Sequence, residues 1–111
     1  MTIEVIEAID HLQSAIHANA VSHGWWDGDQ NGAEKVALMH SELSEALEAM
    51  REGNGPSEKI PAYSCVEEEL ADCVIRILDY AGRHRMDIAG AILAKHEYNM
   101  TRPYKHGGKR F

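Results

Sequence analysis

The chain has 111 residues, of which 11 are lysine or arginine and 18 are aspartate or glutamate, so its formal charge is −7. This length can build one hydrophobic core, and we expect a single domain over residues 1–111. The composition, 44% apolar and 26% charged, excludes disorder, collagen-like repeats and disulfide scaffolds. No apolar stretch approaches the roughly 18–20 residues that cross a bilayer, and the first residues lack a signal-peptide pattern. We therefore expect a cytoplasmic protein that does not contact membranes.

The charge is unevenly distributed along the chain. Arg102, Lys105, Lys109 and Arg110 give residues 102–111 a charge of +4, and subtracting this from −7 leaves −11 on the first 101 residues. Such an acidic body repels duplex nucleic acid, which we do not expect as a partner. A small anion held through metal ions remains compatible with it.

Helical periodicity defines the first half of the chain. Apolar residues recur at intervals of three and four over residues 3–22 and again over 33–51, which predicts two amphipathic helices. A segment rich in glycine, aspartate and asparagine separates them and contains Trp25 and Trp26. The Asn31-Gly32 pair in that segment is typical of a turn.

Capping signals define the second half. Ser64 with Glu67 three residues later predicts a capping box for a helix that ends near residue 81 or 82. Asp87 can cap a fourth helix, which ends near residue 101 because Pro103 follows. No segment alternates with a period of two, so we predict an all-α, four-helix bundle with an irregular basic tail at about 103–111.

The second and third helices carry apolar stripes that we predict to form the core. The stripe residues are Val36, Met39, Leu43, Ala46, Leu47 and Met50 in the second helix, and Val66, Leu70, Cys73, Val74, Ile77 and Ala81 in the third. Leu38, Ala49 and Ile75 add apolar groups on other faces, which indicates burial by another helix or subunit. Cys65 and Cys73 lie about 12 Å apart along one helix, too far for a disulfide, and are expected as small core residues.

Two pairs of acidic residues carry the candidate chemistry. Glu42 and Glu45 are three residues apart and share a face of the second helix, and Glu69 and Asp72 repeat this spacing in the third. If the helices run antiparallel, four carboxylates can meet in a partly covered pocket. Such a pocket favours Mg²⁺ or Mn²⁺, and magnesium commonly shares its ligands with substrate phosphates.

A solvated ion-pair stripe is the alternative for the third helix, because basic residues follow the acidic pair at helical spacing. Its members would be Glu69, Asp72, Arg76, Asp79 and Arg83. The other glutamates nearby are interpreted as solvated surface residues: Glu48, Glu52, Glu67 and Glu68.

The fourth helix offers a complementary polar face. Lys95, Asn99 and Arg102 lie at i, i+4 and i+7, where an ammonium, an amide and a guanidinium could grip a triphosphate. The alternative is an outer polar face whose cations interact with the helix dipole. Trp25 and Trp26 could stack on a base, although tryptophans at a helix boundary more often close a core.

Taken together, these segments resemble the MazG-like, all-α nucleoside triphosphate pyrophosphohydrolases. The resemblance lies in residues 37–48 (ALMHSELSEALE), in 68–72 (EELAD), and in a closing segment with Lys95, Asn99 and Arg102-Pro103-Tyr104-Lys105-His106-Gly107. Gly24-Trp25-Trp26 is similar to the first interhelical loop of single-domain members. The similarity covers roughly residues 20–110.

The resemblance implies a Mg²⁺-dependent enzyme, with Mn²⁺ as a substitute, that cleaves nucleoside triphosphates between the α and β phosphates. It implies metal ligands at Glu42, Glu45, Glu69 and Asp72. From the chemistry of phosphoryl transfer, we also expect Glu45 to orient the attacking water. The resemblance implies that Lys95, Asn99 and Arg102 hold phosphates, and we add Lys105, Trp25 and Trp26 as candidate substrate contacts. Family members assemble as homodimers or homotetramers. The alternatives are a narrow pyrophosphatase for a pyrimidine deoxynucleotide or a biosynthetic nucleotide, and a non-catalytic module that binds metal or nucleotide.

Overall fold

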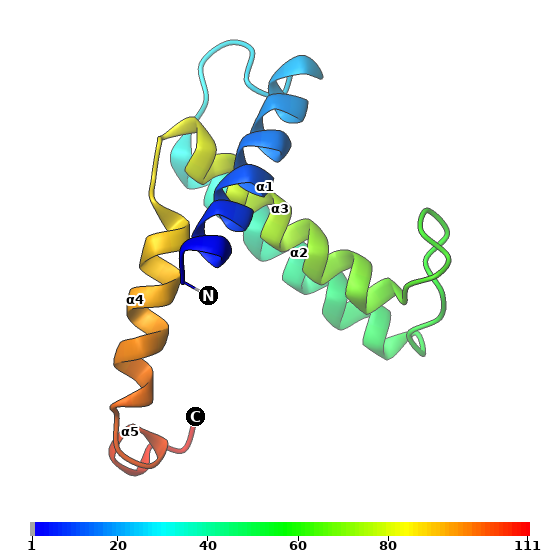
Figure 1. Cartoon of the computed structure of the whole chain (residues 1–111). Helices are drawn as coiled ribbons and strands as arrows, with labels where there is room; N and C mark the ends of the chain where they lie inside the picture. Colours follow the sequence, from blue (N-terminus) through cyan, green and yellow to red (C-terminus); the bar gives the residue numbers. More distant parts are fainter. Residues whose placement is uncertain (1) are drawn as a thin grey trace.

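Helices are the regular secondary structure of this protein, and no β-strand occurs in residues 2–111, the part that the computed structural model describes (Figure 1). The helices are α1 (Thr2–Ser22), α2 (Gly32–Arg51), α3 (Cys65–Arg83), α4 (Ile88–Met100) and the short α5 (Lys105–Gly108). The predicted all-α class is thus confirmed, and the first four helices begin and end within two residues of the predicted bounds.

Side-chain caps fix where three of these helices begin. Ser64 and Glu67 form the predicted capping box at α3, and the Asp87 side chain accepts a hydrogen bond from the Gly90 amide at α4. At α2 the Asn31 side chain accepts hydrogen bonds from the amides of Ala33 and Glu34. The Asn31-Gly32 pair is therefore a helix cap, and each cap contributes about 1 kcal/mol to stability.

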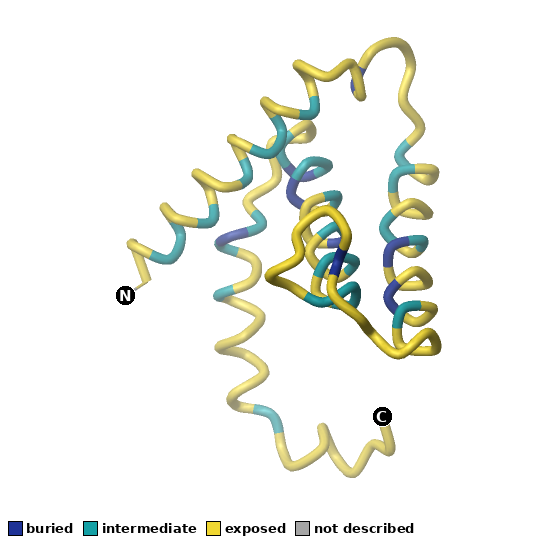
Figure 2. Tube along the Cα trace, turned by 90° about the vertical axis from the view of Figure 1, so that its right-hand side faces the viewer, coloured by how far each residue is buried: buried dark blue, intermediate teal, exposed yellow. Residues whose placement is uncertain are grey.

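Helices α2 and α3 pack as a pair, α1 packs onto this pair, and α4 packs onto α1. α2 and α3 lie side by side and antiparallel, α1 crosses α3, and α4 runs beside α1, directed away from the α2–α3 pair (Figure 1). Figure 2 shows that the buried segments gather where these helices meet. The buried apolar residues are Trp26, Ala46, Cys73, Leu78, Ala81 and Ala89. Cys65 and Cys73 are free thiols, as expected, but only Cys73 is buried in the core, whereas Cys65 is partly exposed.

The apolar stripes of α2 and α3 are only partly covered. Leu47 is 51% exposed and Val74 is 52% exposed, although both were predicted to be core residues. That prediction is wrong for a single chain, because α1 crosses elsewhere on α3 and α4 does not cover this face. The exposed stripe residues are Val36, Leu43, Leu47, Met50, Leu70, Val74 and Ile77.

The tail contains one short turn, α5, where an irregular segment was predicted. Residues 105–108 form the single turn α5, whose backbone lies at positive φ throughout: 52° at Lys105, 53° at His106, 92° at Gly107 and 90° at Gly108. Glycine adopts this left-handed conformation without a Cβ clash, which explains why the turn ends on two glycines. Among residues 2–111, no helix is both long and apolar enough to cross a membrane.

Candidate metal and nucleotide site

A cleft of about 700 Å³ lies between α1, α2 and α3. Carboxylates gather at one end of it and aromatic side chains at the other. Its lining comprises Ala15, Ile16, Asn19, Ala20, Trp25, Trp26, Lys35, Leu38, Glu42, Glu45, Lys59, Glu68, Glu69, Asp72, Ile75, Arg76, Asp79 and Tyr80. The structure therefore brings together all four predicted acidic ligands and both tryptophans.

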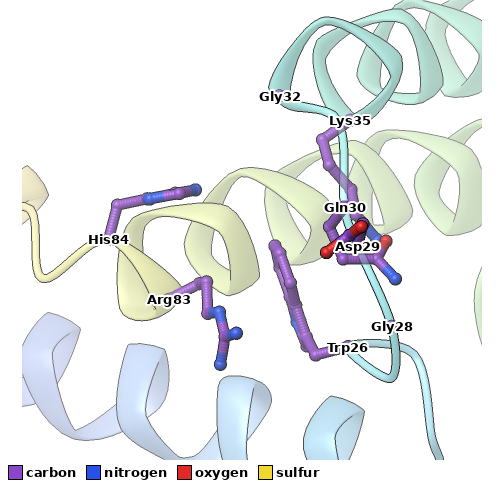
Figure 3. Close-up of a pocket in the computed structure, with 8 residues that line it drawn as sticks. All are labelled: Trp26, Gly28, Asp29, Gln30, Gly32, Lys35, Arg83 and His84. Carbon is purple, nitrogen blue, oxygen red and sulfur yellow. The ribbon is translucent and has the colours of Figure 1, made fainter.

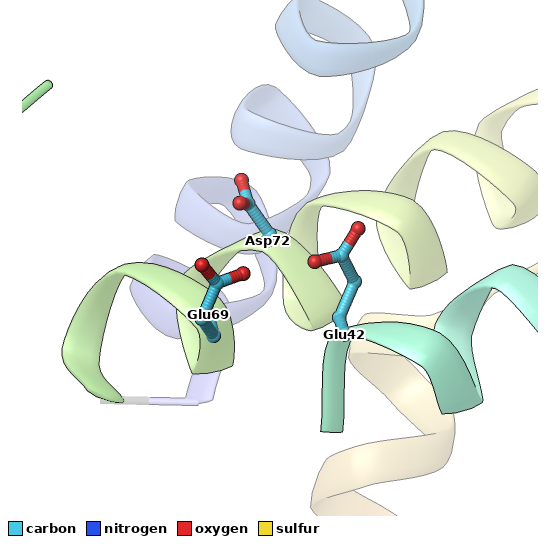
Figure 4. A group of neighbouring side chains, drawn as sticks. All are labelled: Glu42, Glu69 and Asp72. Atoms are coloured by element: carbon cyan, nitrogen blue, oxygen red, sulfur yellow. The ribbon is translucent and has the colours of Figure 1, made fainter. Parts of the chain in front are cut away.

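Three of the acids form a compact group (Figure 4). Glu42 projects from α2 toward Glu69 and Asp72 on α3, and one oxygen of each lies within 4.8 Å of the others. Glu42 is only 6% exposed, and the Oε2 atoms of Glu42 and Glu69 are buried with no hydrogen-bond partner. Buried carboxylate oxygens are normally satisfied, so this donor set fits a hard divalent cation such as Mg²⁺ or Mn²⁺.

The electrostatics of the group reflect its crowding. Burial, together with the neighbouring Glu45 and Glu42 carboxyls, raises the pKa of Glu69 to about 7. Burial and the charges of Glu42 and Glu68 also raise the pKa of Asp72. For Glu42, burial acts in the opposite direction to the hydrogen bond from Arg76, and its pKa is lowered overall. Part of the site thus holds a proton near neutral pH when no cation is bound.

Arg76 is a member of this site that the sequence did not single out. Its Nε donates a hydrogen bond to Glu42 Oε1 at 2.8 Å, which joins α3 to α2. The sequence placed Arg76 in a solvated ion-pair stripe with Glu69 and Asp72. Its position one helical turn after Asp72 was the available signal, but the partner on α2 could not be inferred from spacing along α3.

The outer acids of the cleft differ from expectation. Glu45 lines the cleft but is exposed, and it lies outside the group of three. Glu68 is not the solvated residue that was predicted: it accepts a hydrogen bond from the buried Ser57 hydroxyl, and its Oε2 lies 4.0 Å from Lys59 Nζ. The cause is the loop between α2 and α3, which folds back so that Ser57 meets the start of α3.

The two tryptophans have different surroundings. Trp26 is 7% exposed and its Nε1 donates to Asp79 Oδ1 at 2.9 Å, so it closes the core. His17 Nδ1 lies 2.8 Å from the same oxygen. Trp25 is exposed at the cleft, where its ring is available to a ligand.

Trp26 and Lys35 also border a smaller hollow of about 220 Å³ (Figure 3). Lys35 Nζ lies 4.3 Å from the centroid of the Trp26 ring, and Arg83 Cζ lies 5.2 Å from it. These cation–π contacts fix the tryptophan between α2 and the end of α3.

The predicted phosphate-binding residues of the fourth helix lie elsewhere. Lys95 and Arg102 flank the Tyr98 ring, at 4.6 and 5.9 Å from its centroid, and Lys105 lies beside Tyr104. None of the cleft-lining residues belongs to α4 or the tail. Within one chain, Lys95, Asn99, Arg102 and Lys105 are therefore not brought to the acids, because α4 packs on α1 and runs away from α2.

Comparison with known proteins assigns the chain to no family. No protein-family model matches the chain, and neither the curated proteins nor the solved structures contain a match.

Proposed function

We propose that this protein is a Mg²⁺-dependent nucleoside triphosphate pyrophosphohydrolase of the MazG-like type, which forms a nucleoside monophosphate and pyrophosphate in the cytoplasm. The observation that carries the proposal is the group of Glu42, Glu69 and Asp72, with two buried and unpartnered carboxylate oxygens, at the end of a cleft that also has an aromatic wall. The family resemblance of residues 37–48 and 68–72 supports the same reaction.

The division of roles follows from the cleft. Glu42, Glu69 and Asp72 would hold the divalent cation, which when bound neutralises phosphate charge and lowers the pKa of water. Glu45 lines the same end from its exposed position, where it can accept a proton from an attacking water. Trp25 offers an exposed ring to the base. Phosphoryl transfer depends mainly on positioning and charge stabilisation, which these residues are placed to provide.

The chain is further proposed to act as a homodimer or homotetramer. A broad apolar face with Leu43, Leu47, Leu70 and Val74 is exposed in the single chain, and such a face is typical of a subunit interface. In such an assembly, the basic side chains on and after α4 could reach the acidic cleft of a neighbouring subunit. The roles of Lys95, Asn99, Arg102 and Lys105 stay predictions that depend on this assembly.

The test is a panel of canonical and modified nucleoside triphosphates, incubated with the protein in magnesium or in chelator and in ¹⁸O-labelled water. We expect magnesium-dependent release of monophosphate and pyrophosphate, with the label in the monophosphate because water attacks the α-phosphorus. A strong preference for one pyrimidine deoxynucleotide would identify the protein as a pyrophosphatase specific for that substrate. No turnover of any substrate by the folded protein would refute the enzyme and favour a binding module.

A further inference from the structure

Three basic side chains of this chain line the cleft, and the sequence assigned none of them a role in binding a ligand. Lys35 lies at the aromatic end, with its Nζ against the Trp26 ring. Lys59 lies near Glu68 on the α2–α3 loop, and its side chain is 85% exposed. Arg76 lies between them on α3. The position of each cation along the cleft decides which part of a nucleotide it can reach.

The face of α3 that lines the cleft is polarised. Asp72, Arg76 and Tyr80 follow one another at intervals of four residues, so each is displaced from the last by about 6 Å along the helix. Asp72 belongs to the acidic group, and Tyr80 lies in the aromatic region with Trp26. A nucleotide whose phosphates reach the acids and whose base reaches the aromatic end must pass Arg76 where the phosphates meet the sugar.

The Arg76 guanidinium can bind two anions at once, the Glu42 carboxylate and a ligand in the cleft. Its Nε is used in the 2.8 Å hydrogen bond to Glu42, while its Nη nitrogens make no hydrogen bond with any residue in 2–111. The Arg76 side chain is 40% exposed, whereas that of Glu42 is 8% exposed. A guanidinium carries five N–H donors in a planar fork that matches phosphate geometry, so four of them remain for a ligand.

We propose that Arg76 is a substrate-binding residue whose free Nη groups hold the α-phosphate of the nucleotide, while its Nε stays bonded to the metal ligand Glu42. This inference rests on the proposed function, and it names a residue and a phosphate for that same site. In this arrangement one guanidinium contacts two groups of the reaction centre. These are the Glu42 carboxylate, which would hold the cation, and the α-phosphate, which is attacked.

The alternative is that Arg76 only orients Glu42, and the two roles give different results. If Arg76 merely orients Glu42, Arg76→Gln weakens divalent-cation binding and lowers kcat, and the KM for the nucleotide is little changed. If Arg76 binds the α-phosphate, the KM rises and cation binding without nucleotide is retained. Loss of a charged hydrogen bond corresponds to an increase in KM of about 10- to 100-fold.

The experiment compares Arg76→Gln and Arg76→Lys with wild type and with the control Arg51→Gln, which removes a surface arginine at the end of α2. Calorimetry measures Mn²⁺ binding alone, then binding of the monophosphate product and of inorganic pyrophosphate in magnesium. Circular dichroism checks the fold. We expect Arg76→Gln to weaken the binding of the monophosphate at least tenfold and to leave the affinities for pyrophosphate and Mn²⁺ within about threefold of wild type. The affinity of Arg76→Lys for the monophosphate should lie between those of wild type and Arg76→Gln.

Two results overturn the proposal, and they can be told apart from failure of the proposed function. Equal monophosphate binding by wild type and Arg76→Gln, in an enzyme that turns over, refutes the role of Arg76 alone. A tenfold loss of Mn²⁺ binding with an unchanged KM assigns Arg76 to orienting Glu42. A wild-type protein that neither hydrolyses a triphosphate nor binds the monophosphate refutes both.

Discussion

Replacing Glu69 by glutamine is expected to stabilise the metal-free protein above pH 7, although the same change removes a proposed metal ligand. Burial and the nearby Glu45 and Glu42 carboxyls raise the pKa of Glu69 to about 7 from its ordinary 4.5. Between these values the folded chain keeps a proton that the unfolded chain has released. The free energy of unfolding therefore falls as pH rises from about 4.5 to 7.

The magnitude follows from the difference between the two pKa values. At 1.36 kcal/mol per pH unit, that difference corresponds to at most about 3 kcal/mol. Because Glu69 is partly exposed, solvent screening reduces the expected effect to roughly 1–2 kcal/mol. Glutamine carries no charge at any pH, so the variant should lack the part of this loss that comes from Glu69 and retain only the part that comes from the raised pKa of Asp72. Bound Mg²⁺ should remove the loss in wild type as well, because the cation takes the place of the proton.

The assay is urea unfolding followed by circular dichroism at pH 5 and pH 8, in chelator and in excess magnesium, at one fixed protein concentration because association would add to stability. Glu48→Gln is the matched control, since Glu48 lies on the surface of α2 beside Arg51. If Glu69→Gln is less stable than wild type at pH 8 in chelator, or if Glu48→Gln is stabilised equally, the reasoning about the acidic group is refuted.

Three further predictions concern turnover, assembly and folding. Asp72→Asn should reduce turnover about 100-fold or more with its helicity unchanged, and a similar loss in Glu48→Gln would show that the effect is not specific to the metal site. Leu47→Glu should reduce the mass measured by light scattering to that of one chain, because it places a charge in the proposed interface; an unchanged mass contradicts that interface. Trp26→Ala should cost about 3–5 kcal/mol of unfolding free energy, because this buried ring also bonds Asp79, and a loss below 1 kcal/mol in denaturant titration would contradict its place in the core.

The sequence predicted the helices well because their signals are local. Ser64 and Glu67 cap α3 by bonds between residues three apart, and Asp87 caps α4 in the same way. The acidic pairs were also predictable, because a spacing of three places Glu69 and Asp72 on one face of a helix. Their meeting with Glu42 required only that α2 and α3 run antiparallel through a loop of sufficient length.

What the sequence did not predict depends on how separate elements meet. Arg76 pairs with Glu42 only because of the rotation of α3 against α2, which spacing within α3 does not contain. Glu68 is partly buried because the α2–α3 loop returns to place Ser57 beside it. The direction of α4 depends on the short connection after α3, so the prediction that Lys95 contacts phosphate could not be related to the cleft from the sequence.

A further feature that the sequence did not predict is what covers the apolar stripes of α2 and α3. The periodicity of Leu47 and Val74 correctly indicates faces that avoid water, but it does not say whether the cover comes from the same chain. In a single chain neither residue is buried. Whether a second copy covers them is a property of the assembly, which a helical pattern alone cannot contain.

The most direct test of the proposed metal centre is anomalous diffraction from crystals grown with Mn²⁺ and an α,β-imido nucleoside triphosphate, which the enzyme cannot cleave. We expect a manganese peak within coordination distance of Glu42, Glu69 and Asp72, with the phosphates of the analogue on its open side. A manganese peak elsewhere, or a nucleotide bound in the cleft with no metal at these three carboxylates, would contradict the assignment.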